Sequence, residues 1–374
     1  MSRPSRRPLV AALFALAASL SSSACLPAAN VADDPLDDPL DGEAAPTLDR
    51  APGPDAFVTV FDAVPVFFTG ADNRRVVDAT ARLPEQGAYD AITLRIALSC
   101  PSGGCDPWDR FASLGVVHTD DGGAERTVEL ARFITPFGVG AGFDVDATSL
   151  RPLLRGAVTF RAFIDTWVGP GSGYGDGWLL TVIVDLHGGV PARRPVVVQP
   201  VWSPTAVVYG DPARPPAQTT TLTLPTSTTA TTWELRALVT GHGQGNADNC
   251  AEFCARTHAL SVGGAARERQ VWRDDCETTA APRQQGTWQY PRAGWCPGAD
   301  VRPWVEDVSD AIHTAQARGD LVVGWDVEAY DNTCRPDVST CAACTLGTGC
   351  DYDGGAHTEP VFQLSALLVG FDEP

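Results

Sequence analysis

The sequence predicts an all-β protein made of two antiparallel sandwich or jelly-roll modules. Short runs of β-branched and aromatic residues recur from Phe57 onward, and Gly, Pro and Asp interrupt them. Few stretches keep an apolar period of 3.6 residues for long, which disfavours a helical fold. The chain has 374 residues, 44% of them hydrophobic, so it is long enough for two ordinary domains with real cores.

The expected strands follow one another along the chain after residue 55. They cover residues 57–61, 92–98, 158–168, 179–186, 196–201, 219–224, 233–239 and 361–371. One short helix is expected at 309–318. The first module is expected at 55–190 and the second at 191–374, divided in a region rich in Pro and Thr. The second module carries an insertion rich in Cys and Gly at about 331–357.

The N-terminus has the features of an export signal at residues 1–24. Three arginines precede an apolar run of 12 residues, 9–20, which is too short to span a bilayer. Small residues then precede Cys25, which predicts a lipid on Cys25; an ordinary cleaved secretory signal is the alternative. Residues 25–54 are acidic and rich in Pro and predict a disordered tether. We therefore expect an exported protein, either an outer-membrane or cell-surface lipoprotein or a secreted one.

The charge of the chain is acidic, and its cysteines suit an oxidising compartment. All 27 basic residues are arginine, and 46 acidic residues give a formal net charge of −19. Such a chain lacks the basic surface that nucleic acid or anionic headgroups need, so membrane contact is expected only through a lipid anchor. Of the 11 cysteines, ten remain besides Cys25, an even number that can form five disulfides.

Residues 100–110 form the first stretch with chemical character. Cys100 and Cys105 flank a Gly-Gly turn and can close a small disulfide loop. Trp108, Asp109 and Arg110 follow directly, and an adjacent arginine favours the ionised form of a carboxylate. A turn with a surface salt bridge is the alternative interpretation.

Residues 250–258 form the second stretch. A disulfide between Cys250 and Cys254 would hold Glu252 at the tip of a tight loop, and catalysis needs such rigid placement. A structural staple with an incidental glutamate is equally compatible with this pentapeptide. Cys250, Cys254 and His258 at four-residue spacing could also bind zinc on a helix. The oxidising compartment and the strand-like residues 258–262 oppose that alternative.

The strand expected at 158–168 separates its side chains into two faces. Its even positions are mostly apolar, whereas its odd positions place Arg161, Phe163, Asp165 and Trp167 together. A carboxylate beside a tryptophan suits sugar binding, because the ring stacks on a pyranose and the acid accepts hydroxyl protons. A solvent-exposed strand face is the alternative.

A third cysteine-rich stretch, 292–298, contains Arg292, Trp295 and Cys296, and Cys276 lies upstream as the expected partner of Cys296. These stretches, in this order, resemble the peptide-N-glycosidase F family, secreted bacterial amidases that remove N-linked glycans. The matching segments are 105–110, 131–136, 165–167, 250–254, 256–258 and 292–298. The resemblance implies two eight-stranded antiparallel jelly-roll domains packed side by side, with the active site at their interface.

The resemblance also implies residue roles. The family's principal catalytic aspartate falls on Asp109 and its cysteine-flanked glutamate on Glu252. Its third acid, a glutamate in a Glu-Thr-Trp triplet, falls on Asp165, where this chain is one methylene shorter. The residues expected to shape the pocket are Trp108, Arg110, Trp167, Arg292 and Trp295. The implied disulfides are Cys100–Cys105, Cys250–Cys254 and Cys276–Cys296, and the insertion adds Cys334, Cys341, Cys344 and Cys350 in two further disulfides of open pairing.

The activity implied is hydrolysis of the amide between asparagine and the first N-acetylglucosamine of N-glycosylated proteins or peptides. The products are aspartate and a glycosylamine, and the family requires no metal or cofactor; the protein is expected to be a monomer. One alternative is a glycosidase with two carboxylates. A copper monooxygenase on the same fold is another, opposed by the lack of paired histidines and of any methionine beyond Met1. The third is a surface lipoprotein that binds glycans without turnover.

Overall fold

The computed structural model describes residues 50–119, 123–225, 228–246, 249–335, 350–352 and 355–372. The predicted signal peptide, the predicted lipid on Cys25 and nearly all of the predicted tether lie outside these residues. The last residues of that tether contact the first module: the Gly53 N–H donates to Ala88 O at 2.9 Å. No helix in the described part of the chain is long and apolar enough to cross a membrane.

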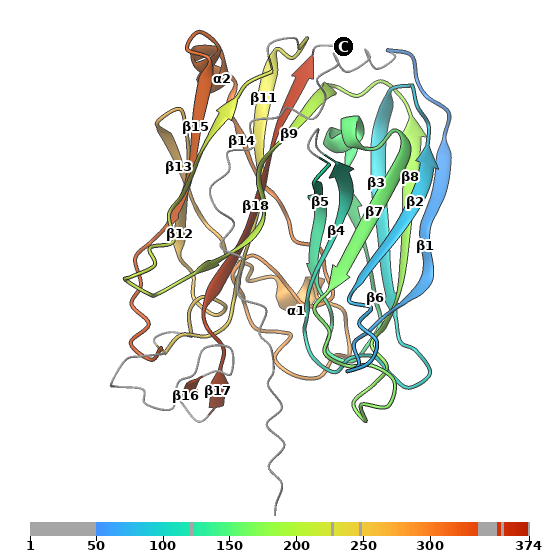
Figure 1. Ribbon diagram of the computed structural model, residues 1–374, viewed down its shortest axis with the longest axis vertical. Helices are drawn as coiled ribbons and strands as arrows, with labels where there is room; N and C mark the ends of the chain where they lie inside the picture. The colour runs from blue at the N-terminus through green and yellow to red at the C-terminus, as the bar shows by residue number, and fades with distance from the viewer. Residues whose placement is uncertain are drawn as a thin grey trace, which may run out of the picture. The chain divides into compact units, whose positions relative to one another are not determined.

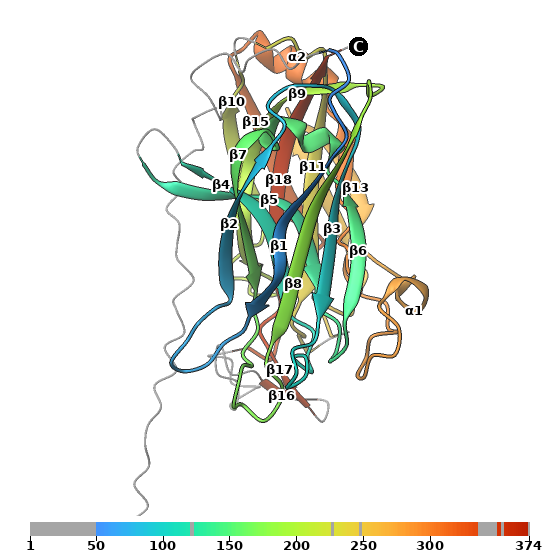
Figure 2. The same cartoon turned by 90° about the vertical axis from the view of Figure 1, so that its right-hand side faces the viewer.

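The first module is a sandwich of two four-stranded antiparallel sheets. One sheet has the order β1 (Ala56–Val66), β8 (Trp178–Gly188), β3 (Tyr89–Ser99), β6 (Ala141–Asp146). The other has the order β2 (Val76–Leu83), β7 (Gly156–Ile164), β4 (Phe111–Thr119), β5 (Glu125–Ile134). A 3-10 helix, η1 (Thr148–Leu153), precedes β7. Figure 2 shows the β1, β8, β3, β6 sheet toward the viewer with the other sheet behind it.

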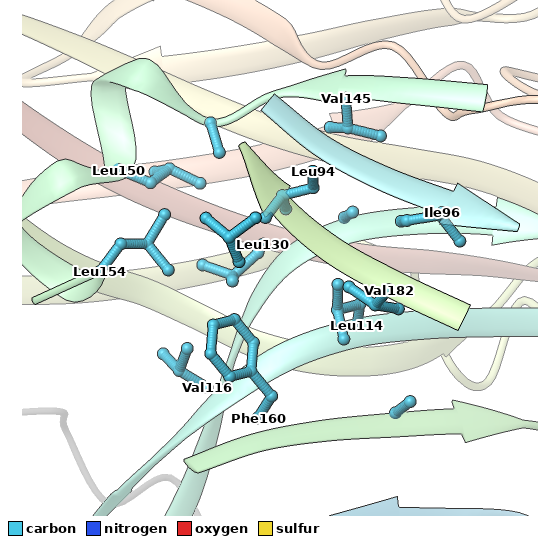
Figure 3. Close-up of a cluster of buried hydrophobic side chains, with 14 of the residues drawn as sticks. Leu94, Ile96, Leu114, Val116, Leu130, Val145, Leu150, Leu154, Phe160 and Val182 are labelled. Carbon is cyan, nitrogen blue, oxygen red and sulfur yellow. The ribbon is translucent and has the colours of Figure 1, made fainter. Parts of the chain in front are cut away.

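The core of this sandwich follows from the alternation of side chains along each strand. In β7 the even positions, from Gly156 to Ile164, are buried and the odd positions are at least partly exposed. Figure 3 shows Phe160 of β7 beside side chains from both sheets, including Leu94, Leu114 and Val182. These residues expose 1% or less of their surface, so the two sheets bury a continuous apolar layer.

The second module is also an eight-stranded sandwich of antiparallel sheets (Figure 1). One sheet has the order β14 (Trp304–Asp307), β11 (Thr232–His242), β18 (Val361–Asp372), β9 (Arg194–Val208). The other has the order β10 (Gln218–Thr223), β15 (Asp320–Val327), β12 (Thr257–Val262), β13 (Ala265–Gln270). The short helices are α1 (Cys276–Thr279) and α2 (Ser309–Gln316), and β16 (Cys350–Tyr352) pairs with β17 (Gly355–His357).

The two sandwiches share buried surface. Val198 of β9 and Leu367, Val369 and Phe371 of β18 belong to the same apolar cluster as the first core. A separate cluster joins Ile134 of the first module to residues of the second: Leu238, Trp295 and Val301. This contact brings the loops of the two modules close enough to form one site.

The predicted fold, two antiparallel eight-stranded jelly-roll modules, is confirmed. Each predicted strand overlaps an observed one, and the expected helix at 309–318 corresponds to α2. The strand predicted at 158–168 is wrong in its length, because β7 ends at Ile164. The chain turns there: the Thr166 N–H donates to Ile164 O at 2.8 Å. The chain passes from the first sandwich to the second between Gly188, where β8 ends, and Arg194, where β9 begins. The predicted domain limits stay a prediction.

Candidate active site

The Cys100–Cys105 disulfide forms as predicted and leads into a turn organised by Asp106. Asp106 is fully buried and accepts hydrogen bonds from the Trp108 N–H (3.0 Å), the Arg110 Nε (2.9 Å) and the Thr166 hydroxyl (2.7 Å). It therefore ties the turn that carries Asp109 to the residue that follows Asp165. The sequence did not single out Asp106; its position between a disulfide cysteine and a proline was the available signal.

Asp109 lies in this turn in a largely desolvated position. Burial raises the pKa of its carboxyl above the usual value, because the charged form loses hydration. The positive charges of Arg292 and Arg110 act in the opposite direction but do not cancel the effect of burial. The structure therefore places Asp109 within the electrostatic reach of both predicted pocket arginines.

Glu252 is held at the tip of the second small loop, as predicted. Cys250 and Cys254 are disulfide-bonded. The Glu252 N–H donates to Gly243 O at 3.0 Å, and the Glu252 carbonyl accepts from the Ala293 N–H at 2.9 Å. These bonds fix the backbone on both sides of the residue, so the side chain leaves the loop in one direction.

The Glu252 carboxyl is the most perturbed acid of the site. Its side chain is 14% exposed and accepts a hydrogen bond from Arg292 Nε at 3.2 Å. Burial and then the nearby charge of Asp109 raise the pKa of Glu252 to about 8, with Arg292 opposing both. The two acids are thus close enough to titrate as a pair, with one arginine acting on both.

Arg292 and Trp295 support the site from below its surface. Arg292 is fully buried, donates to Thr287 O (2.8 Å) and Tyr290 O (2.9 Å), and lies 4.8 Å from the ring centroids of both Phe253 and Trp295. Trp295 is 1% exposed, and its indole N–H donates to Gly241 O at 2.8 Å. We predicted both as pocket residues, and that role stays a prediction. In the structure both side chains are buried, and Trp295 packs against the arginine that bonds Glu252.

Asp165 lies at the rim with a tryptophan and an unpredicted arginine. Arg75 Nη1 is 3.3 Å from the Asp165 carboxylate, and its guanidinium lies 4.3 Å from the Trp167 ring and 4.8 Å from the Phe68 ring. Partial burial raises the pKa of Asp165, opposed by Arg75 and Arg110, and with 43% of the side chain exposed we expect a small shift. Arg75 is 90 residues from Asp165, so no local pattern points to this pair.

The structure therefore brings the predicted acids to one region. The charge of Asp109 acts on Glu252, and the charge of Arg110 acts on both Asp109 and Asp165. The predicted aromatic residues Trp108 and Trp167 stay open to solvent, at 42% and 55% exposure.

The zinc alternative for Cys250, Cys254 and His258 is wrong in this structure, because both sulfurs form the disulfide. His258 is fully buried against Trp325 and Phe362, and burial lowers its pKa to about 3. Among the described residues, no three His, Cys, Asp or Glu side chains lie close enough to hold a metal ion. The Cys276–Cys296 disulfide forms as predicted. Cys334 is disulfide-bonded, but the side chains of Cys341, Cys344 and Cys350 are not among those described.

Two cavities, of about 940 and 810 Å³, lie on the second module and contain none of the three acids. The larger is lined by several acids, three of which already pair with arginines: Asp211 with Arg214, Glu328 with Arg256 and Asp331 with Arg335. Paired surface acids of this kind are typical of a solvated face. The chemistry of the acids, rather than cavity size, therefore identifies the candidate site.

Comparison with known families agrees with the order of these features. The family model described as "Peptide-N-glycosidase F, N terminal" matches residues 114–172, and the model described as "Peptide-N-glycosidase F, C terminal" matches residues 209–320. The matches in both modules support a member of the peptide-N-glycosidase F family. The two jelly-roll modules agree with the fold of that family.

Individual relatives cover different shares of the chain. The peptide-N(4)-(N-acetyl-beta-D-glucosaminyl)asparagine amidase F of Elizabethkingia miricola is 30% identical over 238 residues, which are 59% of this chain and 64% of that protein. The solved PNGase F of Flavobacterium meningosepticum matches with a TM-score of 0.68 and 22% identity, covering 86% of this chain and 97% of that one. The structure of PNGF-II matches with a TM-score of 0.61 and 16% identity, covering 86% and 65%.

Proposed function

We propose that the protein hydrolyses the amide bond between asparagine and the first N-acetylglucosamine of N-glycosylated proteins or peptides. Asp109 and Glu252 are the proposed catalytic residues, and Asp165 orients the substrate. The observation that carries the proposal is the partly buried pair Asp109 and Glu252, both with raised pKa values, with the fully buried Arg292 bonded to Glu252. Two carboxyls that share protons near neutral pH can act as base and acid in one step.

The proposed step consumes one water molecule and uses a second one as a proton relay. Asp109, in its ionised form, takes a proton from the water as the water oxygen bonds to the carbonyl carbon of the asparagine side chain. Glu252 carries a proton near pH 7 because its pKa is about 8. That proton reaches the amide nitrogen through a bridging water, the carbon–nitrogen bond breaks, and a glycosylamine leaves. The asparagine becomes aspartate. Transfer of the proton from Asp109 to Glu252 then restores the starting protonation of both acids.

The rim residues suit a sugar substrate. Trp108 and Trp167 offer exposed rings to pyranose faces, and the carboxylate of Asp165 can accept hydroxyl or amide protons. Arg110 is anchored to Asp106 at 2.9 Å, and its guanidinium lies 5.1 Å from the Trp108 ring. These contacts hold the rim in place around Asp109.

Three disulfides among the described residues favour action outside the cytoplasm, as proposed from the export signal. The lipid on Cys25 and the monomeric state stay predictions. A glycan-binding protein without turnover is the second candidate, because Asp165 replaces the family's glutamate and is held at the rim by Arg75.

The test is incubation with a denatured N-glycoprotein in water enriched in heavy oxygen, followed by mass spectrometry of the peptides. We expect free glycan and one heavy oxygen in the new aspartate. A peptide that keeps one sugar on asparagine would instead indicate a glycosidase, and bound but unreleased glycan would indicate a binding protein.

The matched variant is Asp109→Asn, which we expect to lower kcat/KM by about 10³-fold because it removes the general base. Asp310→Asn, at an exposed acid of α2, is the control and should keep wild-type activity. Full activity in Asp109→Asn would reject the assignment.

A further inference from the structure

Residues 328–333 follow β15, and the proposed mechanism does not use them. They include the start of the insertion rich in Cys and Gly that is predicted at about 331–357. β15 ends at Val327, and the Glu328 N–H then donates to Thr257 O at 2.8 Å. Cys334, directly after these residues, is disulfide-bonded and 5% exposed. The segment 328–333, which we call the insertion root, is therefore anchored at both ends.

The insertion root contacts the hairpin that carries Glu252. The outgoing arm of this hairpin contains Gly243 and Gly245, and the returning arm contains Cys250 and Glu252. The Glu252 N–H donates to Gly243 O at 3.0 Å, and the Gly245 N–H donates to Cys250 O. The proposed catalytic acid thus belongs to a paired arm, and its place depends on where the hairpin is held.

Two asparagines join the hairpin to the insertion root. The Asn246 N–H donates to Asn332 Oδ1 at 3.0 Å. The Asn246 side chain accepts from the Thr333 N–H at 3.1 Å and donates to the Thr333 hydroxyl at 2.5 Å. Asn332 is 4% exposed, and its own N–H donates to Gly210 O at 2.8 Å. Asn332 therefore links the hairpin to the loop that follows β9.

Two more side chains support the hairpin beside these asparagines. Arg256 lies 3.4 Å from the Glu328 carboxylate, and its Nη2 lies 3.5 Å from Cys250 Sγ. Its guanidinium is 5.8 Å from the centroid of the Tyr330 ring. A Cβ at Gly245 would lie only 1.9 Å from the Tyr330 hydroxyl. The hairpin is thus supported at Asn246, at Gly245 and at its disulfide.

Two different sets of contacts therefore determine where the Glu252 carboxyl lies. Arg292 bonds the carboxyl directly, at 3.2 Å. The insertion root instead holds the hairpin from which the side chain extends. A reacting group displaced by about 1 Å can lose about 10²-fold in rate, so support of the hairpin matters for the proposed reaction.

We propose that Asn332 is a positioning residue for Glu252: by holding Asn246, it fixes the hairpin that carries this acid. The first residues of the insertion then contribute to the proposed reaction without touching the substrate. This inference rests on the proposed function, because it concerns how a proposed catalytic acid is placed.

The experiment compares Asn332→Leu with Asn332→Asp. Leucine is similar in size to asparagine but cannot accept the Asn246 N–H, whereas aspartate keeps an acceptor oxygen. We expect Asn332→Leu to lower kcat on a glycopeptide about tenfold and to leave KM unchanged, because a misplaced acid slows the reaction without weakening substrate binding. Asn332→Asp should keep kcat near the wild-type value.

The pH profile separates positioning from a loss of folded protein. Burial and the charge of Asp109 raise the pKa of Glu252 to about 8, opposed by Arg292. A displaced hairpin admits water to the carboxyl and lowers this pKa toward its usual value. The decline of kcat/KM at alkaline pH should therefore begin at a lower pH in Asn332→Leu. A smaller folded fraction would scale the profile without moving it.

Hydrogen exchange tests the same contact without turnover. The N–H groups of Glu252 and Phe253 donate to Gly243 O and Asn249 O, each at 3.0 Å. We expect these two amides to exchange about tenfold faster in Asn332→Leu, because the hairpin opens more often when its support is lost. The amides of β18 should exchange as in the wild type.

Two further variants complete the test. Asp331→Asn is the matched control, because Asp331 adjoins Asn332 but its carboxylate accepts from Arg335 at 2.7 Å; it should behave as the wild type. Asn246→Ala removes the side-chain bonds to Thr333 and should change kcat and exchange in the same direction as Asn332→Leu. It decides the question if Asn332→Leu does not fold.

Wild-type kcat, pH profile and exchange rates in both Asn332→Leu and Asn246→Ala would overturn the positioning role. A wild-type protein that releases no glycan would reject the proposed function instead. The exchange rates would then decide alone whether Asn332 holds the hairpin.

Discussion

Two fully buried arginines each hold a glutamate in this molecule, and the two pairs are built differently. At the contact between the sandwiches, Arg132 donates two hydrogen bonds to Glu129, at 2.9 and 2.7 Å. At the candidate active site, Arg292 donates one bond to Glu252, at 3.2 Å. One pair is a two-point clamp, and the other is a single contact.

The remaining donors of each arginine explain the difference. Arg132 also bonds Leu238 O at 3.2 Å and Gln363 O at 2.6 Å, so it joins the clamp to two strands of the second module. Arg292 instead gives its other N–H groups to Thr287 and Tyr290. Glu252 receives less compensation and also faces Asp109, and its pKa rises to about 8. A single bond beside a like charge thus leaves Glu252 with a raised pKa.

The largest expected effect comes from breaking the clamp. Arg132→Met leaves Glu129 buried without its cation, so we expect the free energy of unfolding to fall by about 3–5 kcal/mol. Chemical denaturation followed by tryptophan fluorescence measures it. The double variant Glu129→Gln with Arg132→Met should recover part of the loss, because no unpaired charge remains. Equal denaturation midpoints for wild type and Arg132→Met would show that the pair does not stabilise the contact between the modules.

The second prediction concerns the single-contact pair. Glu252→Gln removes the proposed proton donor, and we expect kcat/KM at pH 7 to fall about 10²-fold. In the wild type, kcat/KM should decline as the pH rises through the pKa near 8, since Glu252 then loses its proton. Glu129→Gln is the matched control, and its folded fraction should keep the wild-type pH profile. A wild-type profile that stays flat between pH 7 and 10 would contradict the assigned role of Glu252.

The same variant separates function from stability. The folded-state pKa of Glu252 is raised from 4.5 to about 8, so its protonated form stabilises the fold below pH 4.5 and that contribution disappears as the pH rises through 8. Glutamine is neutral at every pH. We therefore expect Glu252→Gln to unfold at a higher temperature than wild type at pH 9 and at the same temperature at pH 4. Identical melting temperatures at pH 9 would mean that the carboxylate is not destabilised by its surroundings.

The sequence predicted the class of the fold because strands and turns leave local signals. The alternation in β7 and the glycine and proline breaks between runs are visible in any short window. The end of β7 was not visible in such a window, because Thr166 turns the chain through a hydrogen bond to Asp106, which is 60 residues away. The three disulfides and the candidate catalytic acids were predicted from small motifs and their resemblance to a family, rather than from periodicity.

The parts of the site that local patterns miss are those made by long-range contacts. Arg75 reaches Asp165 across 90 residues, and Arg132 reaches Gln363 across 231 residues. The burial of Arg292 and Trp295 was also hidden, because a sequence motif does not say which side chains point below the surface. Asp106 was not singled out from the sequence, although its three hydrogen bonds organise the turn.

The smallest expected effect comes from a third arginine–carboxylate pair, Arg75 with Asp165 at the rim. Exposed ion pairs are worth about 0–1 kcal/mol, so a change there should alter kcat/KM about fivefold or less. Asp165→Glu introduces the acid expected from the resemblance and lengthens the side chain by one methylene. We expect kcat/KM on a glycopeptide to rise about threefold, within that limit. Asp165→Asn is the control and should lower it. A lower kcat/KM in Asp165→Glu would show instead that Arg75 and Trp167 are arranged around the shorter acid.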